Sequence, residues 1–119
     1  MASFLKRKLS GSTDGKAILV AATATAGTTI HTAVAGTTAG IFDEIWLYAV
    51  NAHSAEIKLT IEWGEATEPT GNIELTIPNE SGLVLVIPGL ILQNGMVVKA
   101  FAGTANEVMI HGYVNAITD

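Results

Sequence analysis

The feature that most constrains this chain is the strict alternation of apolar and polar side chains over residues 56–63. Apolar side chains occupy every second position from Ile57 to Trp63, with charged or hydroxyl side chains between them. A period of two places these apolar residues on one face of a β-strand, whereas an amphipathic helix needs a period near 3.6. Residues 72–77 and 107–117 show the same alternation. The sequence therefore predicts strands that bury one face.

Further strand signals occur along the rest of the chain. The apolar run at residues 83–87, closed by Pro88-Gly89, predicts a strand covered on both faces, and Asn94-Gly95 predicts a hairpin turn. No segment has convincing helical periodicity. In total we expect about eight strands, over residues 16–22, 28–34, 41–51, 56–63, 72–77, 83–87, 97–102 and 107–117. Short strands at this spacing predict an all-β fold, an antiparallel β-sandwich of jelly-roll type.

Composition sets the broad class of protein. A length of 119 residues predicts one compact domain, and 49% hydrophobic residues exclude a disordered chain. The chain has no cysteine, which excludes a disulfide framework and a thiolate metal site. It also has no run of about 20 unbroken apolar residues, so we expect no membrane span and no membrane partner.

The charge is distributed unevenly along the chain. Residues 1–16 carry four cations and one carboxylate, a net charge of +3, whereas residues 17–119 carry two cations and ten carboxylates, a net charge of −8. We therefore expect residues 1–15 to form an extended basic arm before a single sandwich domain at residues 16–119. A solvated tail has little use for apolar side chains, so docking on a partner is favoured over a solvated terminus. The expected contact residues are Phe4, Leu5, Lys6, Arg7, Lys8 and Leu9.

Motifs for catalysis and cofactor binding are not found in the sequence. There is no G-x-S-x-G nucleophile elbow, and His31, His53 and His111 lack the spacing of metal ligands. Asp43 and Glu44 are adjacent, and neighbours on a strand point to opposite faces. We therefore expect no enzyme activity, no catalytic residues, no metal and no cofactor. If an oxygen-ligand metal site existed, Asp43, Glu44, Glu62 and Glu65 would be its candidate ligands.

Two long segments, residues 17–40 and 81–98, contain no formally charged side chain. A free-standing sandwich usually protects its edges with Lys and Glu. We therefore expect other chains to cover much of this surface, which predicts a homo-oligomer; the alternative is a protein kept soluble by its many hydroxyl and amide groups. Three cations on the arm of an acidic protein would give only weak, salt-sensitive contacts to phosphates, so we expect no specific nucleic-acid binding.

Four segments resemble small virion proteins of tailed bacteriophages: FDEIWLYAVN at residues 42–51, IKLTIEWG at 57–64, VKAFA at 98–102 and GYVNAI at 112–117. The resemblance covers roughly residues 41–117 and implies a capsid-associated β-sandwich without catalytic residues. The expected function is that of a phage virion structural protein, a capsid decoration (cement) protein that binds and stabilises the head shell. Its partners would be other copies of itself and phage coat or other virion proteins, and its location the virion, assembled in the host cytoplasm.

The sequence leaves two alternatives open. One keeps the protein in the virion but places it in the tail, as a tube, terminator or fibre module. The other is a carbohydrate-binding sandwich for host attachment, in which Trp46, Tyr48, Trp63 and Tyr113 stack on sugars. Because Trp63 lies on the apolar face of its strand and the chain has few aromatic residues, a role in the core is favoured over sugar binding.

Overall fold

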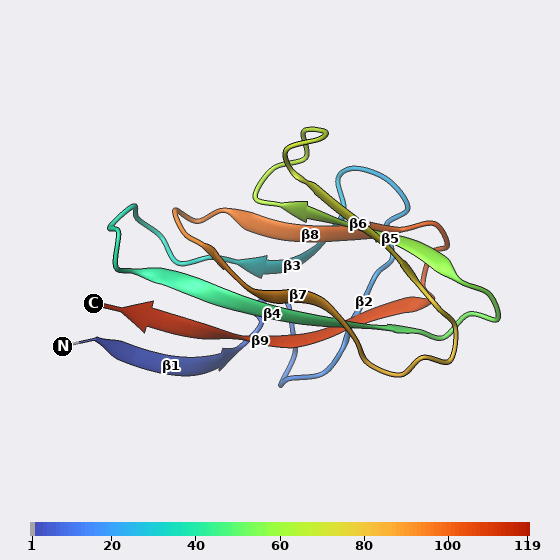
Figure 1. The fold of residues 1–119 in the computed structure, drawn as a ribbon, viewed down its shortest axis with the longest axis horizontal. Coiled ribbons are helices and arrows are strands. Elements are labelled where there is room, and N and C mark those ends of the chain that lie inside the picture. Colours follow the sequence, from blue (N-terminus) through green and yellow to red (C-terminus); the bar gives the residue numbers. More distant parts are fainter. Residues whose placement is uncertain (1) are drawn as a thin grey trace.

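The computed structural model describes residues 2–119, which form two antiparallel β-sheets packed face to face (Figure 1). Sheet A has the strand order β1-β9-β4-β7, with β2 also paired to β9, and sheet B has the order β3-β8-β5-β6. The predicted all-β antiparallel sandwich is confirmed. The strands are β1 (Ser3–Lys8), β2 (Ile18–Leu19), β3 (Thr28–Thr32), β4 (Phe42–Asn51), β5 (Ile57–Trp63), β6 (Asn72–Ile77), β7 (Val84–Leu92), β8 (Val97–Ala102) and β9 (Val108–Thr118).

The strand pairing is that of a jelly roll. β5 pairs with β6, β4 with β7, β3 with β8, and β1 and β2 with β9, each antiparallel. The chain therefore runs as one long hairpin, which is rolled so that β4 also pairs with β9 and β5 with β8. This arrangement yields two Greek keys in two sheets, as a jelly roll requires.

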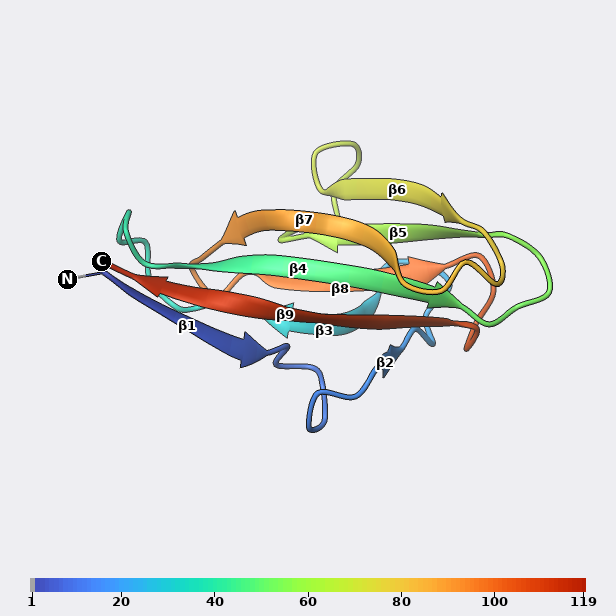
Figure 2. The same ribbon diagram turned by 60° about the horizontal axis from the view of Figure 1, so that its bottom comes forward.

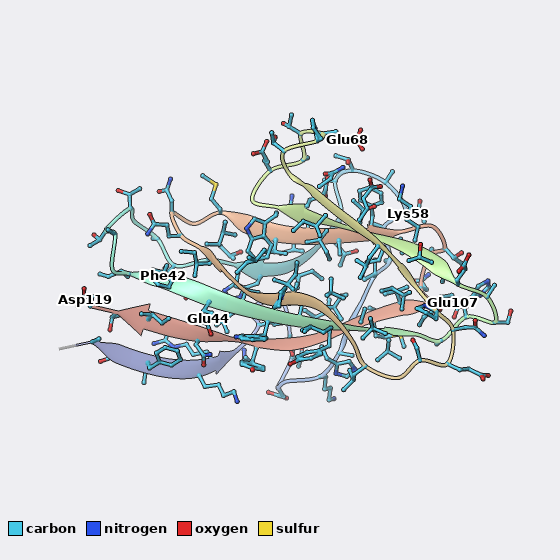
Figure 3. The ribbon with its side chains drawn as sticks, in the orientation of Figure 1. Phe42, Glu44, Lys58, Glu68, Glu107 and Asp119 are labelled. Carbon is cyan, nitrogen blue, oxygen red and sulfur yellow. The ribbon has the colours of Figure 1, made fainter. Side chains whose placement is uncertain are left out.

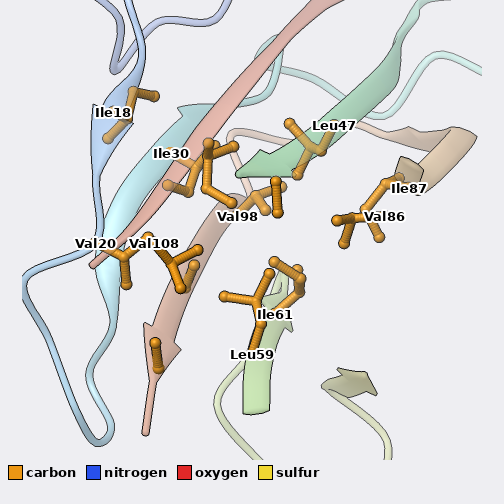
Figure 4. Packing of buried hydrophobic residues seen from close by; sticks show 14 of the residues in the cluster. Ile18, Val20, Ile30, Leu47, Leu59, Ile61, Val86, Ile87, Val98 and Val108 are labelled. Carbon is orange, nitrogen blue, oxygen red and sulfur yellow. The ribbon is translucent and has the colours of Figure 1, made fainter. Parts of the chain in front are cut away.

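The core lies between the two sheets and is built from the alternating positions that the sequence predicts. Along β4, every second residue is buried, including Ile45, Leu47 and Ala49 at 0% exposure. β5 contributes Leu59 and Ile61 from the opposite sheet. Figure 4 shows aliphatic side chains of both sheets meeting in this layer. Burying a side chain of this size contributes about 1.5–3 kcal/mol, so this layer is the main source of stability.

The prediction for residues 83–87 was wrong in two respects. The strand β7 continues through Pro88 and Gly89 to Leu92, and it is an edge strand of sheet A, with Leu85 47% exposed. Proline lacks the N–H that an inner strand must donate, but an edge strand leaves one row of backbone groups unpaired. Register shifts in the pairing of β4 with β7 accommodate the irregular backbone around Pro88.

The N-terminal segment also differs from the predicted arm that precedes the first strand. Ser3–Lys8 is itself a strand, paired with β9 of the same chain from Ser3↔Thr118 to Lys8↔Tyr113. Every residue of β1 is exposed, so no alternation marks it in the sequence. Met1, the first residue of the predicted arm, lies outside the described residues.

Candidate interaction surface

The outer face of sheet A, turned away from sheet B, gathers most of the aromatic side chains of the chain. Residues of β4 that alternate with the buried ones lie on this face, and the register pairs them with their counterparts on β9. Neighbouring strands thus place aromatic and aliphatic groups side by side across the sheet. We define the outer face as Phe42, Glu44, Trp46, Tyr48 and Val50 of β4 with Met109, His111, Tyr113, Asn115 and Ile117 of β9.

Trp46 and Tyr113 form the centre of the outer face. Their ring centroids are 6.3 Å apart with an interplanar angle of 14°, so the rings are stacked. Trp46 also covers the backbone of Gly89 on β7, where a Cβ atom would lie only 2.8 Å from the indole ring. On the other side, the Lys6 ammonium lies 4.3 Å from the centroid of the Tyr113 ring, in cation–π geometry. A continuous row of side chains therefore links β1, β9, β4 and β7.

Glu44 accepts the side-chain hydrogen bonds of the outer face. Its Oε1 atom accepts hydrogen bonds from Trp46 Nε1 (2.8 Å) and from Asn115 Nδ2 (3.0 Å). The bond from Trp46, with a second from Asn115, lowers the pKa of the Glu44 carboxyl below its ordinary value, and partial burial opposes the effect only weakly. The carboxylate thus holds the indole ring of its own strand, β4, and the amide of the neighbouring strand, β9. Figure 3 labels Glu44 on β4.

The lowered pKa of Glu44 predicts a pH dependence of stability. A carboxyl with a lower pKa in the folded state stabilises the fold at pH values above its unfolded pKa, near 4.3, and loses that contribution as the pH falls through the folded value. We therefore expect the free energy of unfolding to decrease more steeply below about pH 4.3 in the native chain than in the Glu44→Gln variant. Denaturant unfolding of both proteins from pH 7 to pH 2.5 measures the difference. Parallel pH profiles would contradict the prediction.

A second polar cluster lies inside the sandwich, where His31 and Asp43 form a clamp with Ser10. His31 Nε2 and Asp43 Oδ2 are 2.7 Å apart and both residues are buried. The Ser10 backbone N–H donates a hydrogen bond to His31 Nδ1 (3.0 Å). The ring proton is therefore on Nε2, and this N–H donates a hydrogen bond to Asp43 Oδ2. Asp43 also accepts the Val34 N–H (3.2 Å). The clamp joins the β1–β2 connection, β3 and β4.

The clamp borders an open hollow of about 640 Å³ between β1, β3 and β4, which Arg7 and Lys8 also line. Although Ser10, His31 and Asp43 resemble a hydrolytic triad in kind, they do not have its geometry. The Ser10 hydroxyl accepts a bond from the Thr32 N–H, and both ring nitrogens of His31 are already engaged. A general base needs a nitrogen open to the nucleophile. The clamp therefore holds segments together rather than activating Ser10.

The structure divides the predicted contact residues into two groups. Phe4, Leu5, Lys6, Arg7 and Lys8 lie on β1 with exposed side chains, Phe4 at 63%. Leu9 was wrongly assigned to a partner contact, because it is 1% exposed and packs in the core of its own chain. The chain turns at this point from sheet A towards sheet B, where the Gly11 N–H donates to the Ile30 carbonyl, and this turn directs Leu9 inward.

The other candidate residues are spread over the molecule. Trp46, Tyr48 and Tyr113 share the outer face, whereas Trp63 belongs to sheet B and packs against the core. The alternation of side chains over residues 42–51 could have shown that Trp46 and Tyr48 share one face, because they alternate with the apolar residues Ile45, Leu47 and Ala49.

The three histidines do not form one cluster with each other, and neither do the four acidic candidates; the one contact between the two sets is that of His31 with Asp43. His53 lies near Glu107 (3.9 Å), and His111 is on the outer face, away from the buried His31. Asp43 and Glu44 point to opposite faces. Glu62 accepts bonds from the Gly27 N–H (2.6 Å) and the Thr25 hydroxyl (2.9 Å), and Glu65 bonds Thr70. Within residues 2–119, no group of three or more potential ligands is placed to hold a metal ion.

No protein-family model, no curated protein and no solved structure matches the chain. The resemblance of residues 41–117 to phage virion proteins therefore stays a prediction. Among residues 2–119, no helix is long and apolar enough to cross a membrane.

Proposed function

We propose that this protein is a structural subunit of a tailed-phage virion, a decoration protein that binds the outside of the head as a homo-oligomer. The observation that carries the proposal is the outer face of sheet A, where aromatic and aliphatic side chains dominate on a domain of jelly-roll fold. Aromatic side chains are enriched at protein interfaces, and exposed apolar patches commonly mark such sites. The resemblance of residues 41–117 to phage virion proteins is the reason for proposing a tailed-phage particle.

The mechanism of such a protein is bridging. A rigid sandwich that buries an apolar face across neighbouring coat subunits resists their separation, because separation would expose that face to water. The cross-strand row from Lys6 to Gly89 provides a stiff, preorganised surface for this purpose. Little conformational entropy would be lost on binding, which favours affinity.

The location of the protein in the particle tests the proposal. Immunogold labelling of purified virions is expected to mark the head, and purified heads stripped of the protein should take it up again from solution. Tyr48→Ala removes an aromatic group from the outer face and should weaken this uptake at least about tenfold. Phe101→Ala is the matched control, since Phe101 is a partly buried aromatic residue on sheet B and should leave uptake unchanged.

Other locations would overturn the decoration role. Label confined to the tail would support the tail-module alternative. Label at the tail tip, together with binding of the protein to a glycan panel that Trp46→Ala abolishes, would support carbohydrate binding by the outer face. Virions without the protein would exclude all three roles.

A further inference from the structure

The exposed large apolar side chains are concentrated at the two edges of sheet A. Of the eight such residues within residues 2–119, seven lie on or directly beside the edge strands, and Met96 in the β7–β8 turn is the exception. Isolated exposed apolar residues need no explanation, but their concentration on two strand edges does. The β1/β2 edge carries Phe4, Leu5 and Leu19, and the β7 edge carries Leu83, Leu85, Leu90 and Ile91.

These two edges lie on opposite sides of the molecule, and the two sides carry opposite net charge. Figure 2 shows β1 and β2 on one side, and β6 and β7 on the other. Residues 2–16 carry four cations and one carboxylate, whereas residues 64–92 carry four glutamates and no cation. Only Glu74 of these four has a cation partner among the described residues, Lys58 of β5 at 2.5 Å. One edge is therefore basic and apolar, whereas β7 itself is apolar and uncharged, and the glutamates lie on β6 and in the loops that flank it, on the same side of the molecule.

The strand directions allow the two edges to pair. β1 is antiparallel to β9, β9 to β4, and β4 to β7, so β1 and β7 run in opposite directions. If a second copy continues sheet A, its β1 meets β7 of the first copy in antiparallel orientation. Both strands are sheet edges, and each presents a row of backbone N–H and C=O groups to a further strand.

We propose that copies of this chain associate head to tail, with the β1 edge of one copy paired to the β7 edge of the next so that sheet A continues across the interface. This inference rests on the proposed self-association, and it adds which two edges meet and in which orientation. The side of one copy that carries the basic β1 edge would meet the acidic β6–β7 side of its neighbour, and this complementarity of net charge disfavours β1–β1 and β7–β7 contacts. A head-to-tail interface of this kind closes into a ring or extends as a filament.

Two double variants test the two edges separately. Phe4→Ser with Leu5→Ser removes the apolar contacts of the β1 edge, and Leu85→Ser with Ile91→Ser removes those of the β7 edge. All four side chains are exposed in the single chain, so circular dichroism should show an unchanged β-rich fold. Each pair of substitutions should weaken self-association at least about a hundredfold. Met96→Ser is the matched control, because Met96 is an exposed apolar residue that lies on neither edge strand, in the turn between β7 and β8.

Light scattering after size exclusion gives the readout. We expect the native chain and Met96→Ser to be oligomers and each edge variant to be a 12.4 kDa monomer. Mixing the two edge variants should then give a one-to-one complex of twice that mass, because each retains the edge that the other lacks.

Three results would overturn the head-to-tail interface: a monomeric native chain, an oligomer that neither pair of substitutions disturbs, or edge variants that stay monomeric when mixed. The last two would leave self-association itself intact. Labelling of the virion tests the decoration role independently of all three.

Discussion

Replacement of Gly112 by alanine is expected to destabilise the fold by more than about 4 kcal/mol, among the largest effects of a single substitution. Gly112 lies in the middle of β9 and pairs with Leu47 of β4. A Cβ atom there would overlap the carbonyl oxygen of Trp46 and lie 3.1 Å from its carbonyl carbon and 3.2 Å from the Leu47 Cα. These are backbone atoms of the central strand pair, so relief requires β4 and β9 to separate.

The Gly112→Ala variant should lower the melting temperature by more than about 10 °C, or leave too little folded protein to purify. Gly103→Ala is the matched control, because the nearest atom to its added Cβ would be the Lys58 carbonyl oxygen at 3.9 Å. Thermal unfolding followed by circular dichroism compares the two variants. Similar melting temperatures for the native chain and Gly112→Ala would show that the central strand pair can shift.

Replacement of Asp43 by alanine is expected to cost about 3–5 kcal/mol in the free energy of unfolding. The variant leaves the Nε2–H of His31 and the N–H of Val34 without their shared acceptor, and His31 is only 4% exposed. A buried donor without a partner costs about 1–3 kcal/mol, and more where a charged acceptor is lost. The loss also loosens the link between β3 and β4.

The Asp43→Asn variant distinguishes the contribution of the charge to stability from the contribution of the hydrogen bond. Its side-chain oxygen can still accept from His31, so we expect a smaller cost, about 1–2 kcal/mol. Glu56→Ala removes an exposed carboxylate and should change stability by less than about 0.5 kcal/mol. Denaturant unfolding measures all three. Equal stability of Asp43→Ala and Glu56→Ala would contradict the assignment of the clamp as a structural element.

Much of the fold could be predicted from local patterns. β5, β6 and β8 lie within one residue of the expected segments, and the expected strands at 41–51 and 107–117 correspond to β4 and β9. These strands bury one face, so the core imposes a period of two on their side chains. The pattern fails at β1, where both faces are exposed and no periodicity is imposed, and at β7, where an edge position permits Pro88 inside a strand.

The candidate surface was predicted only in fragments. The alternation over residues 42–51 places Trp46 and Tyr48 on one face of their strand, but no sequence position shows that Tyr113 shares that face. That result depends on the register of β4 with β9, which joins residues about 70 positions apart. The clamp was also not predictable, because the Ser10 N–H reaches His31 only through the turn that carries the chain from sheet A to sheet B.

By itself, the sequence determined which residues of β4, β5 and β9 face the core, and the class of fold that such strands can form. It also determined the excess of positive charge near the N-terminus and of negative charge beyond it. Only the tertiary structure decided that Leu9 is buried, that β1 completes sheet A, and that the basic β1 edge lies on the opposite side of the molecule from the acidic β6–β7 side. Side-chain alternation is a local property of one strand, whereas edges and faces arise from pairing between distant strands, which no local pattern encodes.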